Sequence, residues 1–185
     1  FQEMGAEVDF LEETYVIRAP RLEGRRVILD YPSHTGTENL LMAACLAKGT
    51  TVIENASVEP EIVDLAGFLC AMGARIQGAG TNTIQVEGTH RLHGAAYRVM
   101  PDRLEAGTFA LAALITGGEV AFRERVGQYL GALTSKLQEA GAEVQAEKKL
   151  YRVRAQDLKS VDVQTFPYPG FPTDCQAPFA TLMTQ

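Results

Sequence analysis

One acidic residue in the last part of the chain stands in an unusually stiff setting. Asp174 belongs to the segment PGFPTDCQAPF, residues 169–179, and prolines 167, 169 and 172 come shortly before it. Each proline fixes its own φ and disfavours helix in the residue before it, so the chain that presents this carboxylate has little freedom. A carboxylate held in this way can serve as a general base for a substrate hydroxyl. Thr173 or Asp174 can also cap the helix that follows, and the residues alone leave both roles open.

A second candidate segment is YPSHT, residues 31–35, which leads into an apolar stretch that is typical of a helix. Backbone N–H groups at a helix start carry partial positive charge, and they bind phosphate or carboxylate groups. The same segment is also explained by a helix cap in which Ser33 or Thr37 bonds the first turn. The segment is therefore a candidate anion-binding loop, with simple capping as the alternative.

Two other conspicuous motifs are better explained by structure than by chemistry. His90 and His93 have no third ligand at a metal-binding spacing, so we expect a surface loop there and no metal site. Gly78 and Gly80 precede a predicted strand instead of a helix. That order indicates a hairpin turn and not a dinucleotide-binding loop.

Composition excludes several classes of partner. The chain has 185 residues, 46% of them hydrophobic and 22% charged, which is typical of a globular protein. Its net charge of -6 argues against nucleic acid or an anionic membrane as the main partner. No apolar run approaches the ~18 residues of a membrane span, and three cysteines at unpatterned spacing predict a reducing cytoplasm. Phe1 stands where an initiator methionine would, so we expect the chain to be part of a longer cytoplasmic protein.

An internal repeat organises the chain and must position both candidate segments. Residues 4–8 (MGAEV) return as 72–76 (MGARI) and as 140–144 (AGAEV), a spacing of 68 residues each time. Alanine- and leucine-rich helices are predicted at 39–47 and 107–115, followed by strands at 50–54 and 119–122 and amphipathic helices at 61–72 and 129–140. Strand pairs are predicted at 74–77 with 83–86 and at 143–146 with 150–153, and a last strand at 27–30 or 161–165. Each repeat is thus an α/β (α+β) unit of the form βαβαββ, and we expect the starts of its first helices to gather at one end of their domain.

Three stretches carry a resemblance to a known family. Residues 35–88 (from TGTENLLMAA to NTIQVEG), 101–118 (PDRLEAGTFALAALITGG) and 167–177 (PYPGFPTDCQA) closely resemble the UDP-N-acetylglucosamine enolpyruvyl transferases. The resemblance implies an inverted barrel of six βαβαββ units, incomplete here, in which residues 1–100 are part of the sugar-nucleotide lobe and 101–185 part of the second lobe. It also implies transfer of the enolpyruvyl group from phosphoenolpyruvate to the sugar 3-hydroxyl, the first committed step of peptidoglycan synthesis. No cofactor or metal is expected, and we expect this chain alone to be inactive.

The resemblance also assigns roles to residues. Asp174 matches the acid of the family's FPTD motif, which is held to act as general base. Ser33, His34 and Thr35 match a segment, usually Ser-Val-Gly, that contacts the uridine diphosphate through backbone amides and the serine hydroxyl. His34 and Thr35 depart from that pattern, and Tyr31 stands where some members carry a lysine, so a charge contact is lost at that position.

Four more residues near these motifs are interpreted through the resemblance. Asp102, Arg103 and Glu105 recur in the family, and we expect them to form the hinge and ion pairs at a helix end, with a share in the site as the alternative. Cys175 is not expected to be reactive, because the family's reactive cysteine belongs to a loop that would precede Phe1. Two alternative functions stay open: enolpyruvyl transfer to shikimate 3-phosphate, and a non-catalytic repeat module that binds a ligand.

Overall fold

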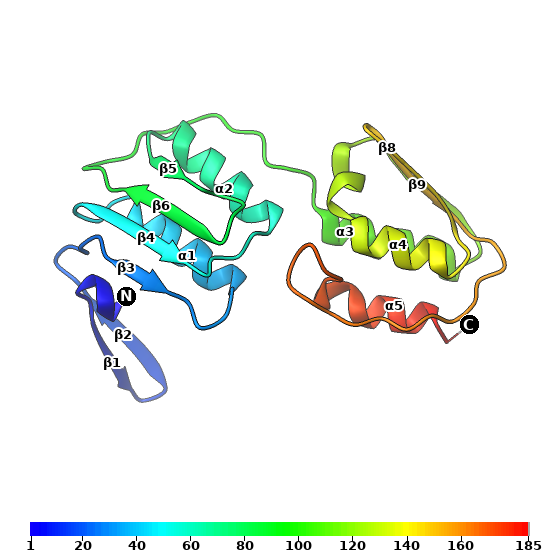
Figure 1. Ribbon diagram of the computed structural model, residues 1–185, viewed down its shortest axis with the longest axis horizontal. Coiled ribbons are helices and arrows are strands. Elements are labelled where there is room, and N and C mark those ends of the chain that lie inside the picture. Colours follow the sequence, from blue (N-terminus) through cyan, green and yellow to red (C-terminus); the bar gives the residue numbers. More distant parts are fainter. Residues whose placement is uncertain (185) are drawn as a thin grey trace. The chain divides into compact units, whose positions relative to one another are not determined.

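The chain forms two compact units, Phe1–Val99 and Met100–Gln185 (Figure 1). The structure is a computed structural model, and it describes residues 1–184. The units meet in sequence at Met100, beside the boundary that the sequence predicts. Which ligand each unit binds stays a prediction.

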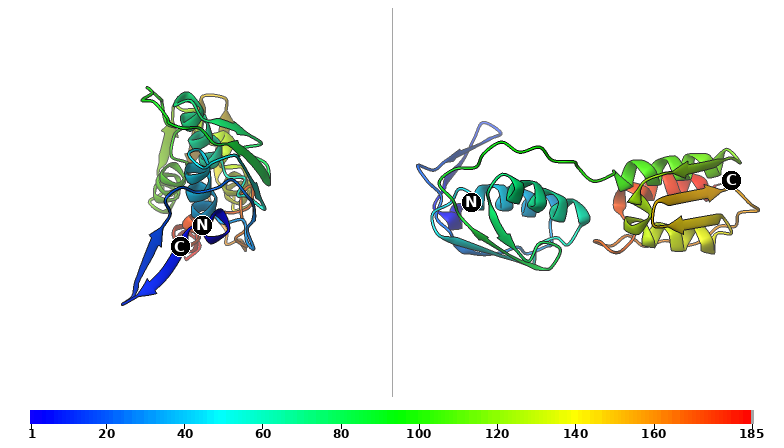
Figure 2. Two further views of the ribbon diagram at one scale, coloured as in Figure 1. Left: turned by 90° about the vertical axis from the view of Figure 1, so that its left-hand side faces the viewer. Right: turned by 90° about the horizontal axis from the view of Figure 1, so that it is seen from above.

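The first unit contains one complete βαβαββ repeat. The repeat consists of β3 (Arg26–Ile28), α1 (His34–Ala44), β4 (Thr50–Glu54), α2 (Pro60–Ala71), β5 (Arg75–Gln77) and β6 (Thr83–Glu87). Its sheet has the order β3-β4-β6-β5, with β3 parallel to β4 and the other neighbours antiparallel. Both helices lie on one face of this sheet (Figure 2). A short 3-10 helix (Gln2–Met4) and a separate hairpin of β1 (Glu7–Leu11) and β2 (Thr14–Arg18) come before the repeat.

The core of the first unit lies between this sheet and its two helices. Along β6, Ile84 and Val86 are fully buried while their neighbours in the strand are exposed, which is the alternation of a sheet with one covered face. Leu41 of α1 and Ile62 of α2 are fully buried in the same cluster. The two helices therefore cover one face of the sheet with their apolar side chains.

The second unit repeats this arrangement without a first strand. It consists of α3 (Arg103–Ile115), β7 (Glu119–Phe122), a 3-10 helix (Arg125–Tyr129), α4 (Gly131–Glu139), β8 (Glu143–Glu147), β9 (Leu150–Arg154), a second 3-10 helix (Thr173–Cys175) and α5 (Gln176–Leu182). The sheet has the order β7-β9-β8 and is antiparallel throughout. Figure 1 shows α3 and α4 between this sheet and α5. In the described part of the chain, no helix combines the length and apolar character that a membrane span needs.

The predicted strand at 161–165 is wrong. These residues form no strand, and Thr165 makes only an isolated bridge to Phe171. In the first unit the equivalent strand, β3, forms by pairing with β4, which follows the next helix. Residues 161–165 have no such partner among the strands of residues 1–184. A β-branched segment without a partner strand gains no ladder hydrogen bonds, so it runs as an irregular connection.

Candidate functional site

Asp174 is exposed on a turn whose two flanks are anchored in the core. It lies in the 3-10 helix Thr173–Cys175. Phe171 before it is 4% exposed and Cys175 after it is fully buried. The Phe171 ring meets the ring of Phe179 on α5 edge-on, with 5.2 Å between the centroids. The turn is therefore held in place on both sides, and the carboxylate that it carries is exposed to solvent.

The structure tests one of the two roles that the sequence leaves open for this turn, which is the helix cap. Neither the 3-10 helix nor α5 begins with a side-chain capping bond, and their N-cap residues are Pro172 and Cys175. The capping interpretation of Thr173 and Asp174 is therefore wrong. The carboxylate remains available for another partner.

A buried arginine lies in the same part of the second unit. Arg103, the first residue of α3, is only 4% exposed, and its guanidinium carbon lies 5.2 Å from the centre of the Tyr168 ring. Burial raises the pKa of the Cys175 thiol, while the positive charge of Arg103 lowers it and the negative charge of Asp174 raises it. The thiol thus lies within electrostatic reach of both charges. Besides its place at the start of α3, Arg103 therefore lies close enough to affect Cys175, the residue that follows Asp174.

The starts of α3 and α5 approach each other closely. A Cβ atom added to Gly107 would lie 3.1 Å from the Cys175 sulfur and 3.1 Å from a methyl group of Leu133, which is closer than side chains normally pack. A side chain at this position would push these neighbours back by a few tenths of an ångström, so α3 packs closely against the Asp174 turn. The predicted gathering of first-helix starts is confirmed within this unit.

A shallow depression opens beside the start of α3. It measures about 400 Å³, and its lining includes Asp102, Glu105, Phe109 and Arg123. Asp102 caps the helix, because its Oδ1 accepts hydrogen bonds from the backbone N–H groups of Leu104 (2.8 Å) and Glu105 (3.0 Å). Asp102 therefore stabilises the start of α3 and also lines the depression.

The candidate anion-binding loop forms the cap of α1. Ser33 is the N-cap residue, and its Oγ accepts a hydrogen bond from the Gly36 N–H at 3.1 Å. Tyr31 and Thr35 are exposed, while Ser33 and His34 are half-buried. The capping interpretation of Ser33 is confirmed. A hydroxyl that accepts one hydrogen bond can still donate another, so capping leaves Ser33 a donor for a ligand.

Thr37 ties this loop to the start of α2. The fully buried Thr37 hydroxyl donates to the Ser33 carbonyl at 2.7 Å and accepts from the Ser57 N–H at 2.9 Å. Ser57 itself is 2% exposed and lies shortly before α2. One hydroxyl thus fixes the relative positions of two helix starts.

We expect Thr37→Val to lower the free energy of unfolding by about 1–3 kcal/mol, because it leaves the buried Ser57 N–H without its acceptor while keeping the side-chain shape. Urea denaturation of the two proteins measures the difference. Thr35→Val is the matched control, since Thr35 is exposed, and it should change stability by less than about 0.5 kcal/mol. Equal stability of the Thr37→Val variant and the parent chain would show that this hydroxyl does not hold the loop.

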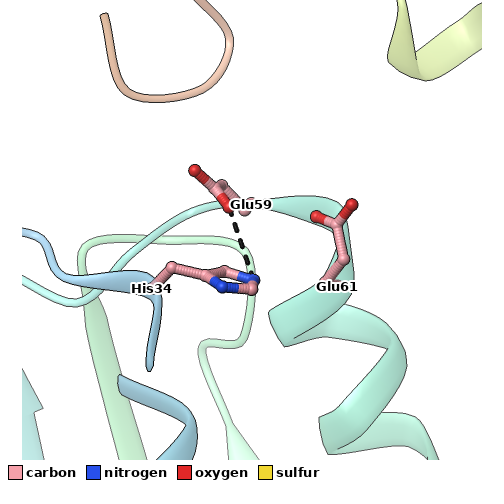
Figure 3. A group of neighbouring side chains, drawn as sticks. All are labelled: His34, Glu59 and Glu61. Carbon is pink, nitrogen blue, oxygen red and sulfur yellow. Dashed lines mark ion pairs between the residues drawn. The ribbon is translucent and has the colours of Figure 1, made fainter. Parts of the chain in front are cut away.

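The two helix starts bring together three side chains that the sequence does not connect. His34 Nε2 lies 3.4 Å from Glu59 Oε2 and 3.7 Å from Glu38 Oε1. His34, Glu59 and Glu61 each offer one ligand atom, and these atoms all lie within 4.8 Å of one another. Figure 3 shows His34 and Glu59 pointing toward each other, with Glu61 beside them on the first turn of α2. The sequence predicts His34 as a nucleotide contact but gives no sign of this cluster, because its members are far apart in the chain.

The two buried cysteines, Cys45 and Cys175, show no sign of nucleophilic activation. All three are free thiols, and only Cys70 is exposed. Burial raises the pKa of the Cys45 thiol to about 11, and the nearby Cys70 adds to the shift. Because the thiolate is the reactive form, a raised pKa keeps Cys45 and Cys175 inert at neutral pH.

The predicted site residues thus fall into two groups. The first group lies around the start of α1 in the first unit: Tyr31 and Ser33 precede the helix, and His34 and Thr35 are its first two residues. Asp174 lies in the second unit. Their predicted contacts with ligands stay predictions.

Relatives of high sequence identity bear one name. The chain is 51% identical over 184 residues to the UDP-N-acetylglucosamine 1-carboxyvinyltransferase of Oleidesulfovibrio alaskensis. The matched segment covers 98% of this chain and 44% of that protein. It is 49% identical over 185 residues to UDP-N-acetylglucosamine 1-carboxyvinyltransferase 1 of Caldanaerobacter subterraneus, and this match covers 100% of this chain and 45% of that protein. The chain therefore spans less than half the length of these relatives.

Solved structures and a family profile agree on the fold. The enolpyruvyl transferase NikO from Streptomyces tendae matches 98% of this chain and 47% of its own, with a TM-score of 0.85 and 21% identity. EPSP synthase from Acinetobacter baumannii matches 99% of this chain and 42% of its own, with a TM-score of 0.57 and 22% identity. These matches confirm the predicted enolpyruvyl-transferase-like fold, and the three open sheets of residues 1–184 fit its incomplete form. The profile of EPSP synthase (3-phosphoshikimate 1-carboxyvinyltransferase) matches residues 1–185, so the chain belongs to the EPSP synthase family.

Proposed function

We propose that this chain supplies part of a cytoplasmic enzyme that transfers the enolpyruvyl group of phosphoenolpyruvate to the 3-hydroxyl of UDP-N-acetylglucosamine and releases phosphate. One observation carries the proposal: relatives named UDP-N-acetylglucosamine 1-carboxyvinyltransferase match the chain at about half of all positions along nearly its whole length. The first committed step of peptidoglycan synthesis, and through it cell shape and division, would then depend on this protein. The chain alone would be inactive, because it spans less than half of those relatives.

In the proposed reaction Asp174 acts as the general base. It accepts the proton of the sugar 3-hydroxyl while the hydroxyl oxygen bonds to the central carbon of phosphoenolpyruvate, whose methylene carbon takes up a proton. The adduct then loses a proton from the new methyl group as the bond to phosphate breaks. An exposed carboxylate on a turn anchored by Phe171 and Cys175 suits this role, because proton transfer requires a donor and acceptor at hydrogen-bond distance.

Arg103 supplies one positive charge near that base. Phosphoenolpyruvate carries a phosphate and a carboxylate, so its site needs several cations. Arg103 is buried beside Tyr168 and close enough to Cys175 to affect the thiol. We propose that it contributes to the field that holds the anionic substrate, and that further cations come from other parts of the longer protein.

The loop 31–35 is the proposed contact for the uridine diphosphate. It lies at the start of α1, where backbone N–H groups favour anions. The Ser33 hydroxyl retains the capacity to donate. Tyr31 carries no positive charge, so binding would rest on backbone and hydroxyl donors.

Shikimate 3-phosphate is a second candidate acceptor, because the matching family profile bears the name of the enzyme that uses it. The test is thermal unfolding of the intact protein with each ligand alone. UDP-N-acetylglucosamine at 100 times its dissociation constant should stabilise the protein by about 2.7 kcal/mol, and shikimate 3-phosphate should not. Stabilisation by shikimate 3-phosphate alone would overturn the assignment of the substrate.

A further inference from the structure

We propose that His34, Glu59 and Glu61 form a binding site for a divalent transition-metal cation, of which Zn²⁺ is the best match. The site would lie between the starts of α1 and α2 in the first unit. It goes beyond the proposed transfer reaction and does not depend on it. It also departs from the sequence-based expectation, which considered only His90 and His93 as metal ligands.

The spacing of the ligand atoms fits a single small cation. Four ligands arranged tetrahedrally at roughly 2.1 Å from Zn²⁺ lie about 3.4 Å from one another. His34 Nε2 and Glu59 Oε2 are 3.4 Å apart. All three ligand atoms lie within 4.8 Å of one another, so an oxygen would have to shift by at most roughly 1.4 Å to reach tetrahedral spacing.

The environment of His34 Nε2 suits a metal ligand. His34 Nε2 is shielded from solvent and makes no hydrogen bond, although carboxylate oxygens of Glu59 and Glu38 lie at 3.4 and 3.7 Å. The His34 side chain as a whole is 38% exposed, so the group lies close to the surface of the first unit. A buried polar atom without a hydrogen bond is costly, and a cation bound to its lone pair would remove that cost.

The chemistry of the ligands selects the kind of metal. One imidazole nitrogen and two carboxylate oxygens suit Zn²⁺, Co²⁺ or Mn²⁺ better than Mg²⁺ or Ca²⁺, which prefer oxygen ligands alone. Three protein ligands leave a fourth position for water. Two helix starts point at the group and carry partial positive charge, which opposes a cation and keeps the affinity moderate.

A simple ion pair is the competing explanation. A protonated imidazole between Glu59 and Glu38 would also account for this arrangement without a metal. The two explanations differ in a measurable way. A protonated imidazole has no lone pair free for a cation, so an ion pair of this kind would show no stoichiometric metal binding.

The test is titration of the 185-residue chain with Zn²⁺ alone, followed by calorimetry, and with Co²⁺ alone, followed by its visible absorption. Both use a Cys70→Ser background, because Cys70 is the exposed thiol and would bind these metals itself. We expect one equivalent of Zn²⁺ to bind, and the Co²⁺ spectrum to show imidazole and oxygen ligation.

Two variants and one control decide the outcome. His34→Val, which introduces the residue usual in the resembling family, and Glu61→Gln, which keeps the side-chain shape, should each weaken Zn²⁺ binding at least roughly tenfold, since even residues outside the metal's direct ligands cost that much. His90→Gln, which removes an exposed histidine elsewhere, should bind as the parent does. Circular dichroism confirms that each variant is folded. Absence of stoichiometric binding by the parent, or unchanged binding by both variants, would overturn the proposal and leave an ion pair only, while the transfer reaction assigned to Asp174 would be unaffected.

Discussion

Asp174→Asn in the intact protein lowers the turnover number for phosphate release by roughly 10²–10⁴-fold, the usual contribution of a positioned general base. The amide keeps the size of the side chain but cannot accept the hydroxyl proton. The loss should appear in the turnover number with little change in stability, because Asp174 is exposed and caps no helix. Steady-state kinetics with both substrates and urea denaturation measure the two effects.

A second aspartate of the same unit provides the control for this experiment. Asp162 is also exposed, but it lies in the irregular connection before the turn and outside the FPTD segment. Asp162→Asn should therefore leave the turnover number unchanged. Turnover by the Asp174→Asn variant equal to that of the control would remove the assignment of Asp174 as the base.

Phe179→Ala lowers the free energy of unfolding of the second unit by about 3–5 kcal/mol, because it removes a large side chain from a closely packed core. Phe179 is fully buried, and its ring supports Phe171 edge-on just before the Asp174 turn. The substitution should therefore loosen the turn as well as destabilise α5. Hydrogen exchange of the backbone amides of β9 reports the free energy of unfolding of this unit.

The control for the aromatic contact lies in the same segment. Phe166 is 55% exposed, so Phe166→Ala should change the free energy of unfolding by less than about 0.5 kcal/mol. If both alanine variants were equally stable, the contact between Phe171 and Phe179 would not be what fixes the turn.

Local patterns predicted most of the secondary structure, and they failed where an element depends on a distant partner. The strands β4 and β7 have the predicted bounds, because each short segment of apolar or β-branched residues follows a glycine that ends the preceding helix. Helices α1 and α3 begin several residues earlier than predicted, since Ser33 and Asp102 cap them ahead of the alanine- and leucine-rich stretches. The segment 161–165 has the composition of a strand, but no neighbouring strand pairs with it in the described residues.

The candidate site was predictable to the extent that its residues are close in sequence. The motif around Asp174 and the loop 31–35 could be identified as segments, since prolines and helix-start residues mark them. The burial of Arg103 under Tyr168 and the approach of His34 to Glu59 arise from the packing of helix starts, which periodicity does not describe.

The most direct measurement is a crystal structure of the intact protein with UDP-N-acetylglucosamine bound. We expect a carboxylate oxygen of Asp174 within about 2.6–3.2 Å of the sugar 3-hydroxyl, or joined to it through one water molecule, as a general base requires. The diphosphate should lie at the start of α1, against Ser33. A bound sugar whose 3-hydroxyl is out of reach of Asp174 would contradict the central claim that this turn presents the catalytic base.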